Sequence, residues 1–379
     1  MPSRITIRSP RHTLTLPHST PLSSTLPFAK LISRSTVLRK ARVLSPSSSC
    51  LASSTARNST EVTDRQQVNL SSFTVDRIIG TGSFARVKVA RYKETSEVVA
   101  LKIMSKAEIL RKKQVEHVRN ERTLLTTLSS PFIVTLKGAF QDRENLYLIE
   151  EFVQGGELYS VIRQKRRLNV AEATFYLAEI ASAFTYLHSR HVLYRDLKPE
   201  NVLLTSSGHI KLSDFGFAKC LSSSEKTYTV CGTPEYLAPE VIRLEGHSYS
   251  YDWWCLGILL YEMVVGKAPF LHKNPYKLYE KILNKEIAFP ANMDPKARDL
   301  IEKLTRKDPK ERLTETEVMA HSFFRSVNWC VARQCGLSPP FTKDILSDFD
   351  SHHFDHYPDE RVRLADRRTV TEDLFKCFN

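Results

Sequence analysis

The chain has 379 residues, of which 55 are Lys or Arg and 42 are Asp or Glu, and its formal net charge is +13. Much of the excess positive charge lies at the N-terminal end, where residues 1–60 hold nine Lys or Arg and no Asp or Glu. The other residues are nearly balanced in charge and show no excess of basic residues typical of nucleic-acid binding. The longest apolar run, 255–260, is too short for a transmembrane segment. Seven cysteines without a CxxC pair favour a reducing compartment.

Residues 1–68 form a compositional region of their own. Of the first 60 residues 22 are Ser or Thr, with few large apolar side chains, so the segment cannot bury a core and is predicted to be disordered. Its lack of acidic residues also matches an organelle transit peptide. We therefore expect either a plain extension of a cytoplasmic or nuclear protein, or an organelle-targeting sequence.

The next region is rich in predicted strands, and the one after it in predicted helices. Strands are predicted at 73–79, 87–90, 98–103, 134–137 and 146–149, with one helix at 108–128. After the glycine pair at 155–156, helices are predicted at 158–163, 171–189, 250–265, 276–283, 295–305 and 314–320. The fold class is thus α+β, with a small β-rich lobe at 73–153, a larger α-helical lobe at 154–324 and a cleft between them.

Short phrases in a fixed order carry the chemistry. The first, GTGSFARV at 80–87, has glycines that let backbone N–H groups approach phosphates closely. The others are VVALK at 98–102, YRDLKPEN at 194–201, DFG at 214–216 and APE at 238–240. Asn201 and Asp214, within the third and fourth phrases, offer the hard oxygen ligands that suit Mg²⁺.

In this order the phrases resemble the protein-kinase signature, and the resemblance covers about residues 73–379. Tyr194 in place of the more usual His, together with TVCGTPEYLAPE at 229–240, is similar to the AGC group of Ser/Thr kinases and, within it, to the cAMP-dependent kinases. The resemblance implies a two-lobed protein kinase fold whose C-terminal tail, 325–379, wraps the N-lobe. In that tail FDHY at 354–357 would cross the nucleotide pocket, and FKCF at 375–378 would dock on the small lobe.

The resemblance also implies a role for each site residue. Asp196 is the base that accepts the proton of the substrate hydroxyl, and Lys198 neutralises the transferred γ-phosphoryl group. Lys102, paired with Glu121, holds the α- and β-phosphates of ATP, while Asn201 and Asp214 bind Mg²⁺. The other expected ATP-binding positions are Gly80, Thr81, Gly82, Ser83, Phe84, Ala85, Val87, Ala100, Glu151, Val153, Glu157, Leu203 and Phe354.

Substrate choice and control follow from the same resemblance. Glu157, Glu200 and Glu262 match the acids with which the family reads arginines before the target Ser or Thr, since carboxylate and guanidinium pair through two hydrogen bonds. Thr229 falls at the activation-loop phosphosite. The cations expected around its phosphate are Arg195, Lys219 and His117.

Three features depart from the family pattern. Ala85 replaces a usual glycine, the activation segment is longer around 222–224, and Glu150 puts a carboxylate at the back of the adenine pocket, where it could compete with Glu121 for Lys102. A cGMP-dependent-like or other AGC kinase, and a pseudokinase scaffold without chemistry, remain alternatives. The 68 residues before the kinase region cannot hold a cyclic-nucleotide domain, so such control would come from a separate regulatory subunit.

Overall fold

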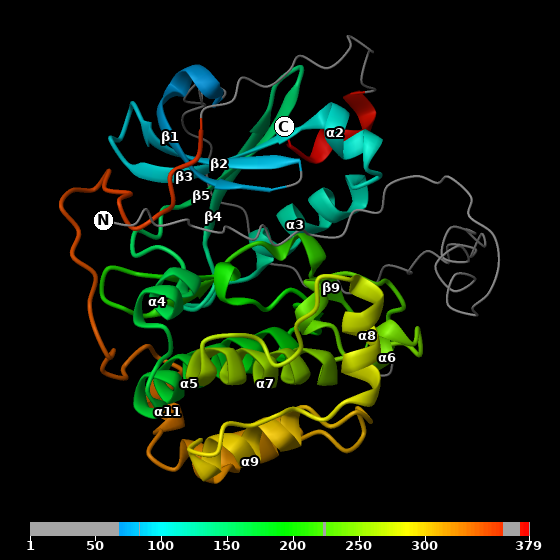
Figure 1. Cartoon of the computed structure of the whole chain (residues 1–379). Coiled ribbons are helices and arrows are strands. Elements are labelled where there is room, and N and C mark those ends of the chain that lie inside the picture. The colour runs from blue at the N-terminus through cyan, green and yellow to red at the C-terminus, as the bar shows by residue number, and fades with distance from the viewer. Residues whose placement is uncertain (1–67, 83, 223–224, 359–371, 379) are drawn as a thin grey trace, which may run out of the picture. The chain divides into compact units, whose positions relative to one another are not determined.

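The computed structural model describes residues 68–82, 84–222, 225–358 and 372–378. The predicted extension at 1–68 therefore lies outside the described residues except for Val68, and so does Ser83 of the glycine phrase. The described chain forms a strand-rich lobe and a helix-rich lobe (Figure 1), which confirms the predicted two-lobed α+β architecture. In this described part, no helix combines the length and apolarity that crossing a membrane requires.

A five-stranded antiparallel sheet with the order β1-β2-β3-β5-β4 builds the small lobe. Its strands are β1 (Phe73–Thr81), β2 (Ala85–Tyr92), β3 (Val98–Ser105), β4 (Leu136–Gln141) and β5 (Asn145–Glu151). The alternation of apolar residues predicted all five strands, although β4 begins two residues later than expected.

The single helix expected at 108–128 is wrong, because the segment holds two helices, α2 (Lys106–Arg111) and α3 (Val115–Thr127). Lys113 between them has a left-handed backbone with φ of 55°. The N–H of Gln114 donates to the carbonyl of Ile109 at 2.8 Å, and the N–H of Lys113 donates to that of Leu110 at 3.1 Å. These two bonds close α2 with a Schellman motif that usually carries glycine.

The large lobe is helical around one apolar core. Its helices are α4 (Leu158–Lys165), α5 (Val170–Ser189), α6 (Pro239–Ile242), α7 (Ser250–Val265), α8 (Pro275–Asn284), α9 (Pro295–Leu304), α10 (Glu315–Ala320) and α11 (Trp329–Ala332). The helices predicted for this lobe are all present, with ends that differ by no more than two residues. The short α6 and α11 were not predicted.

Short elements at the floor of the cleft position the chemical groups. Strand β6 (Val192–Leu193) pairs with β9 (Lys219–Cys220), and β7 (Val202–Leu204) pairs with β8 (Ile210–Leu212). Short 3-10 helices complete the described part: η2 (Leu70–Ser72), η3 (Pro199–Asn201), η4 (Phe215–Phe217), η5 (Pro234–Tyr236), η6 (Ser322–Phe324) and η7 (Glu372–Phe378).

The end of the chain returns to the small lobe, beside α2 (Figure 1). Phe375 and Phe378 are fully buried in a cluster with Met104, Ile109 and Val118, which lie on β3, α2 and α3. Gln141 also donates from Nε2 to the carbonyl of Phe375 at 2.9 Å. The predicted docking of the tail on the small lobe is therefore confirmed.

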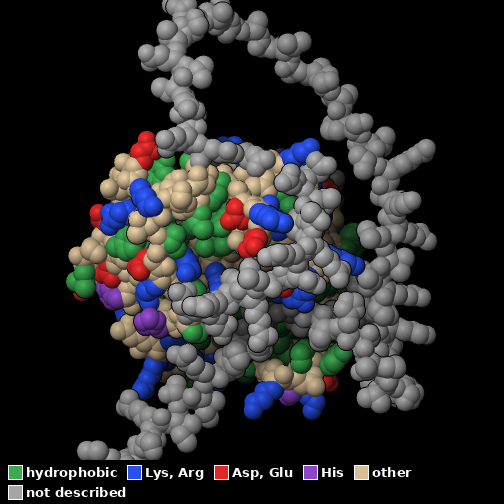
Figure 2. Space-filling model, turned by 90° about the horizontal axis from the view of Figure 1, so that it is seen from above, with side chains coloured by type: hydrophobic (Ala, Val, Ile, Leu, Met, Phe, Trp, Pro, Cys, Tyr) green, Lys and Arg blue, Asp and Glu red, His purple; other side chains and the backbone are tan. Residues whose placement is uncertain are grey.

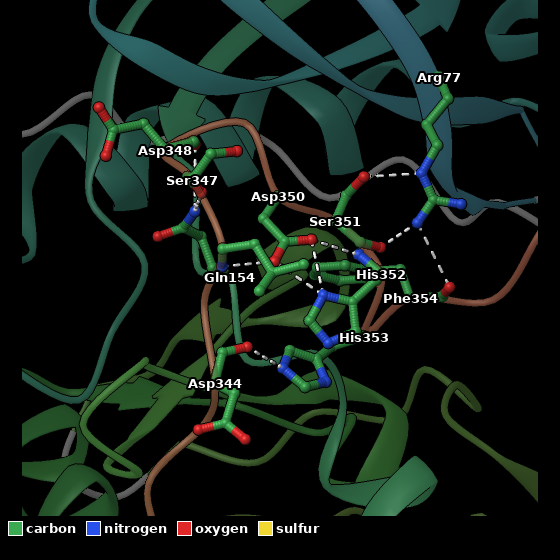
Figure 3. A network of polar contacts seen from close by, with 11 residues as sticks. Arg77, Gln154, Asp344, Ser347, Asp348, Asp350, Ser351, His352, His353 and Phe354 are labelled. Atoms are coloured by element: carbon green, nitrogen blue, oxygen red, sulfur yellow. Dashed lines mark hydrogen bonds and ion pairs between the residues drawn. The ribbon is translucent and has the colours of Figure 1, made fainter.

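An earlier part of the tail fixes itself to β1 and to the connection between the lobes (Figure 3). Arg77 on β1 donates from Nε to the Ser351 hydroxyl at 2.7 Å, and Gln154 donates from Nε2 to the Ser347 carbonyl at 2.9 Å. Gly156 has φ of 74°, and a Cβ there would lie 2.5 Å from the carbonyl oxygen of His353. Only glycine therefore allows the tail to pass this closely.

Candidate active site

Lys102 on β3 joins the two halves of the cleft. Its Nζ lies 2.6 Å from Oε1 of Glu121 on α3 and 3.0 Å from Oδ1 of Asp214. Burial works against the ammonium form, but the charges of Asp214 and Glu121 outweigh it and raise the pKa of Lys102. The lysine is thus held as a cation, and the pairing with Glu121 expected from the sequence is present.

Asp214 follows β8 and is turned toward solvent. Its backbone is left-handed, with φ of 56°, and its side chain is 45% exposed although its neighbour Phe215 is fully buried. The nearby charge of Lys102 lowers the pKa of Asp214, so this carboxylate stays ionised. The N–H of Ser213 donates to the carbonyl of Asn201 at 3.0 Å, which ties the segment of Asp214 to that of Asn201.

Asp196 is buried, with 2% of its surface exposed, and one side of its carboxylate is fully engaged. Its Oδ2 accepts hydrogen bonds from Lys198 Nζ at 3.0 Å and from Asn201 Nδ2 at 2.8 Å. Its Oδ1 is buried and has no hydrogen-bond partner among the described residues. Burial raises the pKa of Asp196 to about 6, against the opposing charge of Lys198.

Asp252 on α7, for which the sequence analysis predicted no role, positions the segment that holds Asp196. It is fully buried and accepts hydrogen bonds from the backbone N–H groups of Tyr194 at 3.0 Å and Arg195 at 2.9 Å. Arg195 has φ of 69°, so the loop needs such support to hold its shape. A carboxylate in the first turn of the 250–265 segment, directly before a long apolar run, was the signal that could have identified it.

The residues expected around the nucleotide come together under the sheet. Ala100 is buried in a cluster with Ile79 and Val89, against which Val87 and Phe354 pack, and the Phe354 ring stacks on that of Phe152 at 6.0 Å. In the glycine hairpin, the N–H of Gly82 donates to the carbonyl of Ala85 at 2.8 Å.

The other predicted nucleotide positions lie around this cluster and the hairpin. Phe84 and Ala85 are partly buried against the cluster that holds the tail phenylalanines, so the Ala85 methyl group is accommodated. Gly80 and Thr81 pair with Val87 and Arg86 across the hairpin, and Glu157 bridges to Leu203. Val153 is buried, and the side chain of Glu151 is engaged with Lys211 at 2.7 Å.

A comparison with known proteins identifies the family that has this arrangement of residues. Residues 73–324 match the family model described as "Protein kinase domain". The chain belongs to the protein kinase family.

Curated relatives agree with this assignment. The kinase is 42% identical over 319 residues to "cAMP-dependent protein kinase catalytic subunit 3" of Drosophila melanogaster, covering 83% of this chain and 54% of that protein, so it spans about half the length of that relative. It is 45% identical over 296 residues to the Homo sapiens "cAMP-dependent protein kinase catalytic subunit PRKX", covering 77% and 82% respectively. With the Saccharomyces cerevisiae "cAMP-dependent protein kinase type 3" it shares 43% identity over 303 residues, covering 78% and 76%. The chain is thus a Ser/Thr protein kinase similar to the cAMP-dependent members of the AGC group.

Glu150 is a buried acid at the back of the kinase cleft. It lies on β5 opposite Ala100 of β3, with 9% of its surface exposed. Burial raises the pKa of Glu150 to about 7, while the charge of Lys102 opposes this. The two carboxylates that hydrogen-bond Lys102 are Glu121 and Asp214, so Glu150 acts on the lysine through its charge.

The three predicted arginine-reading acids do not share one environment. Glu157 is half-buried, and burial together with the charge of Glu200 raises the pKa of Glu157 to about 8, which places these two acids within electrostatic range. Glu262 on α7 is 2% exposed, and its Oε2 accepts a hydrogen bond from the Tyr236 hydroxyl at 2.7 Å. Glu157 is thus within electrostatic range of Glu200, whereas the Glu262 carboxylate is hydrogen-bonded inside the large lobe.

Two of the three cations predicted for the phosphosite, Lys219 and Arg195, contact Thr227 rather than Thr229. Lys219 Nζ and Arg195 Nη1 lie 3.2 and 3.4 Å from the Thr227 hydroxyl, which is buried, whereas Thr229 is exposed. His117 is nearby, since burial and then the charge of Arg195 lower its pKa. Lys219 and Arg195 thus meet two residues before the expected phosphosite, and His117 lies within electrostatic range of Arg195.

Proposed function

We propose that this kinase transfers the γ-phosphoryl group of Mg²⁺–ATP to Ser or Thr hydroxyls that follow arginine residues. The single observation that carries the proposal is the state of Asp196. Its Oδ2 is held by Lys198 and Asn201, while its buried Oδ1 has no partner among the described residues. A fixed carboxylate oxygen with an unused acceptor site is what a base needs to receive a hydroxyl proton.

The chemistry of the residues present fits Mg²⁺ and ATP. Asp214 offers an ionised, half-exposed carboxylate. The side-chain nitrogen of Asn201 donates to Asp196, which leaves the side-chain oxygen of Asn201 as the atom for a cation. Both are the hard oxygen ligands that Mg²⁺ prefers. Bound Mg²⁺ would neutralise phosphate charge, while Lys102 and the glycine hairpin would hold the phosphate oxygens.

Arginine selection is supported by the electrostatics of Glu157 and Glu200. Each raises the energy of the other's charged form, and burial adds to this for Glu157. A guanidinium group placed between them would relieve the repulsion and pair with carboxylate through two hydrogen bonds, which the ammonium group of lysine cannot do. We include Glu262 only as a distal member of the set, because its carboxylate is hydrogen-bonded to Tyr236.

Control by phosphorylation and by a partner is also part of the proposal. A phosphate on the exposed Thr229 would find Arg195 and Lys219 within a short rearrangement, because both already contact Thr227, and His117 lies within electrostatic range of Arg195. A separate cyclic-nucleotide-binding regulatory subunit is supported by the relatives, two of which are named cAMP-dependent protein kinase catalytic subunits. We place the protein in the cytoplasm, supported by the free cysteines of the described chain.

The test is a transfer assay with the purified chain, Mg²⁺–ATP and an Arg-Arg-x-Ser-x peptide, with Asp196→Asn as the inactive control. We expect phosphate on the serine, weaker transfer to the Ala-Ala-x-Ser-x peptide, and inhibition by a regulatory subunit that cAMP relieves. Absence of transfer by the phosphorylated chain would favour a pseudokinase scaffold. Equal use of both peptides would remove the arginine preference and leave the kinase assignment intact.

A further inference from the structure

Away from the cleft, three side chains of different chemistry converge beside the turn between β7 and β8. Glu179 lies on α5, His209 directly precedes β8, and Cys335 follows α11. One oxygen, one nitrogen and the sulfur of these residues all lie within 4.8 Å of one another. Carboxylate, imidazole and thiolate are the donor types that bind Zn²⁺ in proteins.

Two of the three groups are held in place by neighbouring atoms. Glu179 is fully buried, its Oε2 accepts the N–H of Ile210 at 3.0 Å, and its Oε1 lies 2.6 Å from Nδ1 of His209. The backbone N–H of His209 donates to the Thr205 hydroxyl at 3.0 Å. Contacts of this kind orient metal ligands before the ion arrives.

A buried tyrosine hydroxyl near the cluster is a second sign that the site has room for another hydrogen-bonding group. Tyr176 lies one turn before Glu179 on α5, and its hydroxyl is buried without a hydrogen-bond partner in the described part of the chain. Burial and then the charge of Glu179 raise the pKa of Tyr176, so the two groups are within electrostatic range. A metal-bound water at this cluster would have a buried hydroxyl close by to bond.

A hydrogen bond between Glu179 and His209 explains why these two side chains lie together, but it does not explain why the Cys335 thiol lies beside them. Burial raises the pKa of Cys335 to about 11, with a further contribution from Glu179, so the free thiol is protonated and slow to oxidise. Cys335 belongs to a segment that crosses the β7–β8 turn closely. The N–H of Lys343 donates to the Ser206 carbonyl at 2.9 Å, and a Cβ on Gly208 would lie 2.1 Å from the Phe341 carbonyl oxygen.

We propose that Glu179, His209 and Cys335 bind one Zn²⁺ ion, with water as the fourth ligand. On binding, Cys335 releases its thiol proton to solvent, and the proton shared between Glu179 Oε1 and His209 Nδ1 leaves for solvent or for Nε2, so that His209 is neutral with its proton on Nε2 and Sγ, Nδ1 and Oε1 are free to coordinate. The ion would cross-link the segment 335–343 to the β7–β8 turn. Because β7 follows Asn201 and β8 precedes Asp214, this cross-link would stabilise the hairpin between these two residues.

The first experiment measures zinc on the intact chain. Protein stripped with a chelator is dialysed against Zn²⁺ in excess Mg²⁺, which occupies the oxygen ligands of the cleft, and bound zinc is counted by elemental analysis. We expect one equivalent in the wild type and in Cys330→Ser, the matched control with an exposed free thiol, and its loss in Cys335→Ser and His209→Asn. Zinc at roughly 100 times its Kd should raise the Tm of the wild type by about 5 °C.

The second experiment needs no variant and so does not depend on how the variants fold. Wild-type protein is treated with N-ethylmaleimide with and without Zn²⁺, and the modified cysteines are identified by peptide mass spectrometry. Zinc should protect Cys335 and leave Cys330 reactive. Equal zinc binding by Cys335→Ser, or folded wild type that gains neither zinc nor protection of Cys335, would overturn the proposal without touching the kinase assignment.

Discussion

The acidic side chains of the cleft fall into two sets that differ in their partners. Glu121, Asp214 and Asp196 each lie within 3.0 Å of a lysine ammonium group. Glu150 and Glu157 form no ion pair with a described residue, and burial raises the pKa of these two carboxyls to about 7 and about 8. Lysine thus stabilises the charged form of each carboxylate in the paired set, while the charge of the unpaired set is costly until a cation comes near.

The largest expected effect follows from removing members of the paired set. Asp196→Ala should lower kcat by about a thousandfold while nucleotide still binds, because it removes the proton acceptor and leaves the Lys102–Asp214 pair in place. Asp214→Ala should lower activity as much but mainly by weakening Mg²⁺–ATP binding, since it removes a metal ligand. Steady-state kinetics together with nucleotide titration separate the two. Near-normal turnover of either variant would contradict the roles assigned to this set.

The pH dependence of kcat in the wild type tests the role of Asp196 as the base. The pKa of Asp196 is raised to about 6, so the proton that blocks its acceptor oxygen binds as the pH falls through 6. We expect kcat to be constant from pH 7 to 8 and to fall about tenfold for each unit below 6. The measurement is kcat at saturating substrates from pH 5 to 8. A rate independent of pH down to 5 would show that Asp196 is not the titrating base.

A smaller effect concerns stability and the unpaired Glu150. Because its pKa is about 7 in the folded protein and near 4.5 when unfolded, the folded state binds the proton more tightly, and wild-type stability falls as the pH rises through this window. Glu150→Gln should therefore raise the free energy of unfolding by about 1–3 kcal/mol at pH 8 and leave it nearly unchanged at pH 4.5.

Glu151→Gln is the matched control for this experiment. The Glu151 carboxylate pairs with Lys211 at 2.7 Å and accepts the Thr135 N–H at 2.7 Å, so its neutralisation should lower stability. Denaturant unfolding of both variants at the two pH values gives the comparison. The same sign for Glu150→Gln and Glu151→Gln at pH 8 would mean that Glu150 is compensated by partners.

The sequence predicted the long elements and the Lys102–Glu121 pair, for reasons that are local. Helices such as α5 and α7 have long periodic or apolar patterns, and Lys102, Asp196 and Asp214 stand in phrases whose spacing indicates their use. The break between α2 and α3 was missed because Lys113, not glycine, takes the left-handed position. Strands β6 to β9 are too short to give a periodic signal.

What the sequence did not show depends on contacts between distant segments. The support of Tyr194 and Arg195 by Asp252, and the meeting of Arg195 with Lys219 at Thr227, arise only when α7, the catalytic loop and the activation segment pack together. Likewise, Glu150 was recognised as unusual from its position, but whether it would take Lys102 from Glu121 depended on side-chain geometry, which favours Glu121.

The proposed reading of substrate arginines by Glu157 and Glu200 is tested most directly by a double-mutant cycle between Glu200, which acts on the unpaired Glu157 through its charge, and the substrate arginines. Wild type, Glu200→Ala and the exposed-surface control Glu311→Ala are each assayed on Arg-Arg-x-Ser-x and on Ala-substituted peptides. We predict that Glu200→Ala lowers kcat/KM about tenfold on the arginine peptide and little on the alanine peptide, a coupling of about 1.4 kcal/mol that Glu311→Ala lacks. Losses that simply add would show that Glu200 is an ordinary surface charge and would contradict a substrate-reading set.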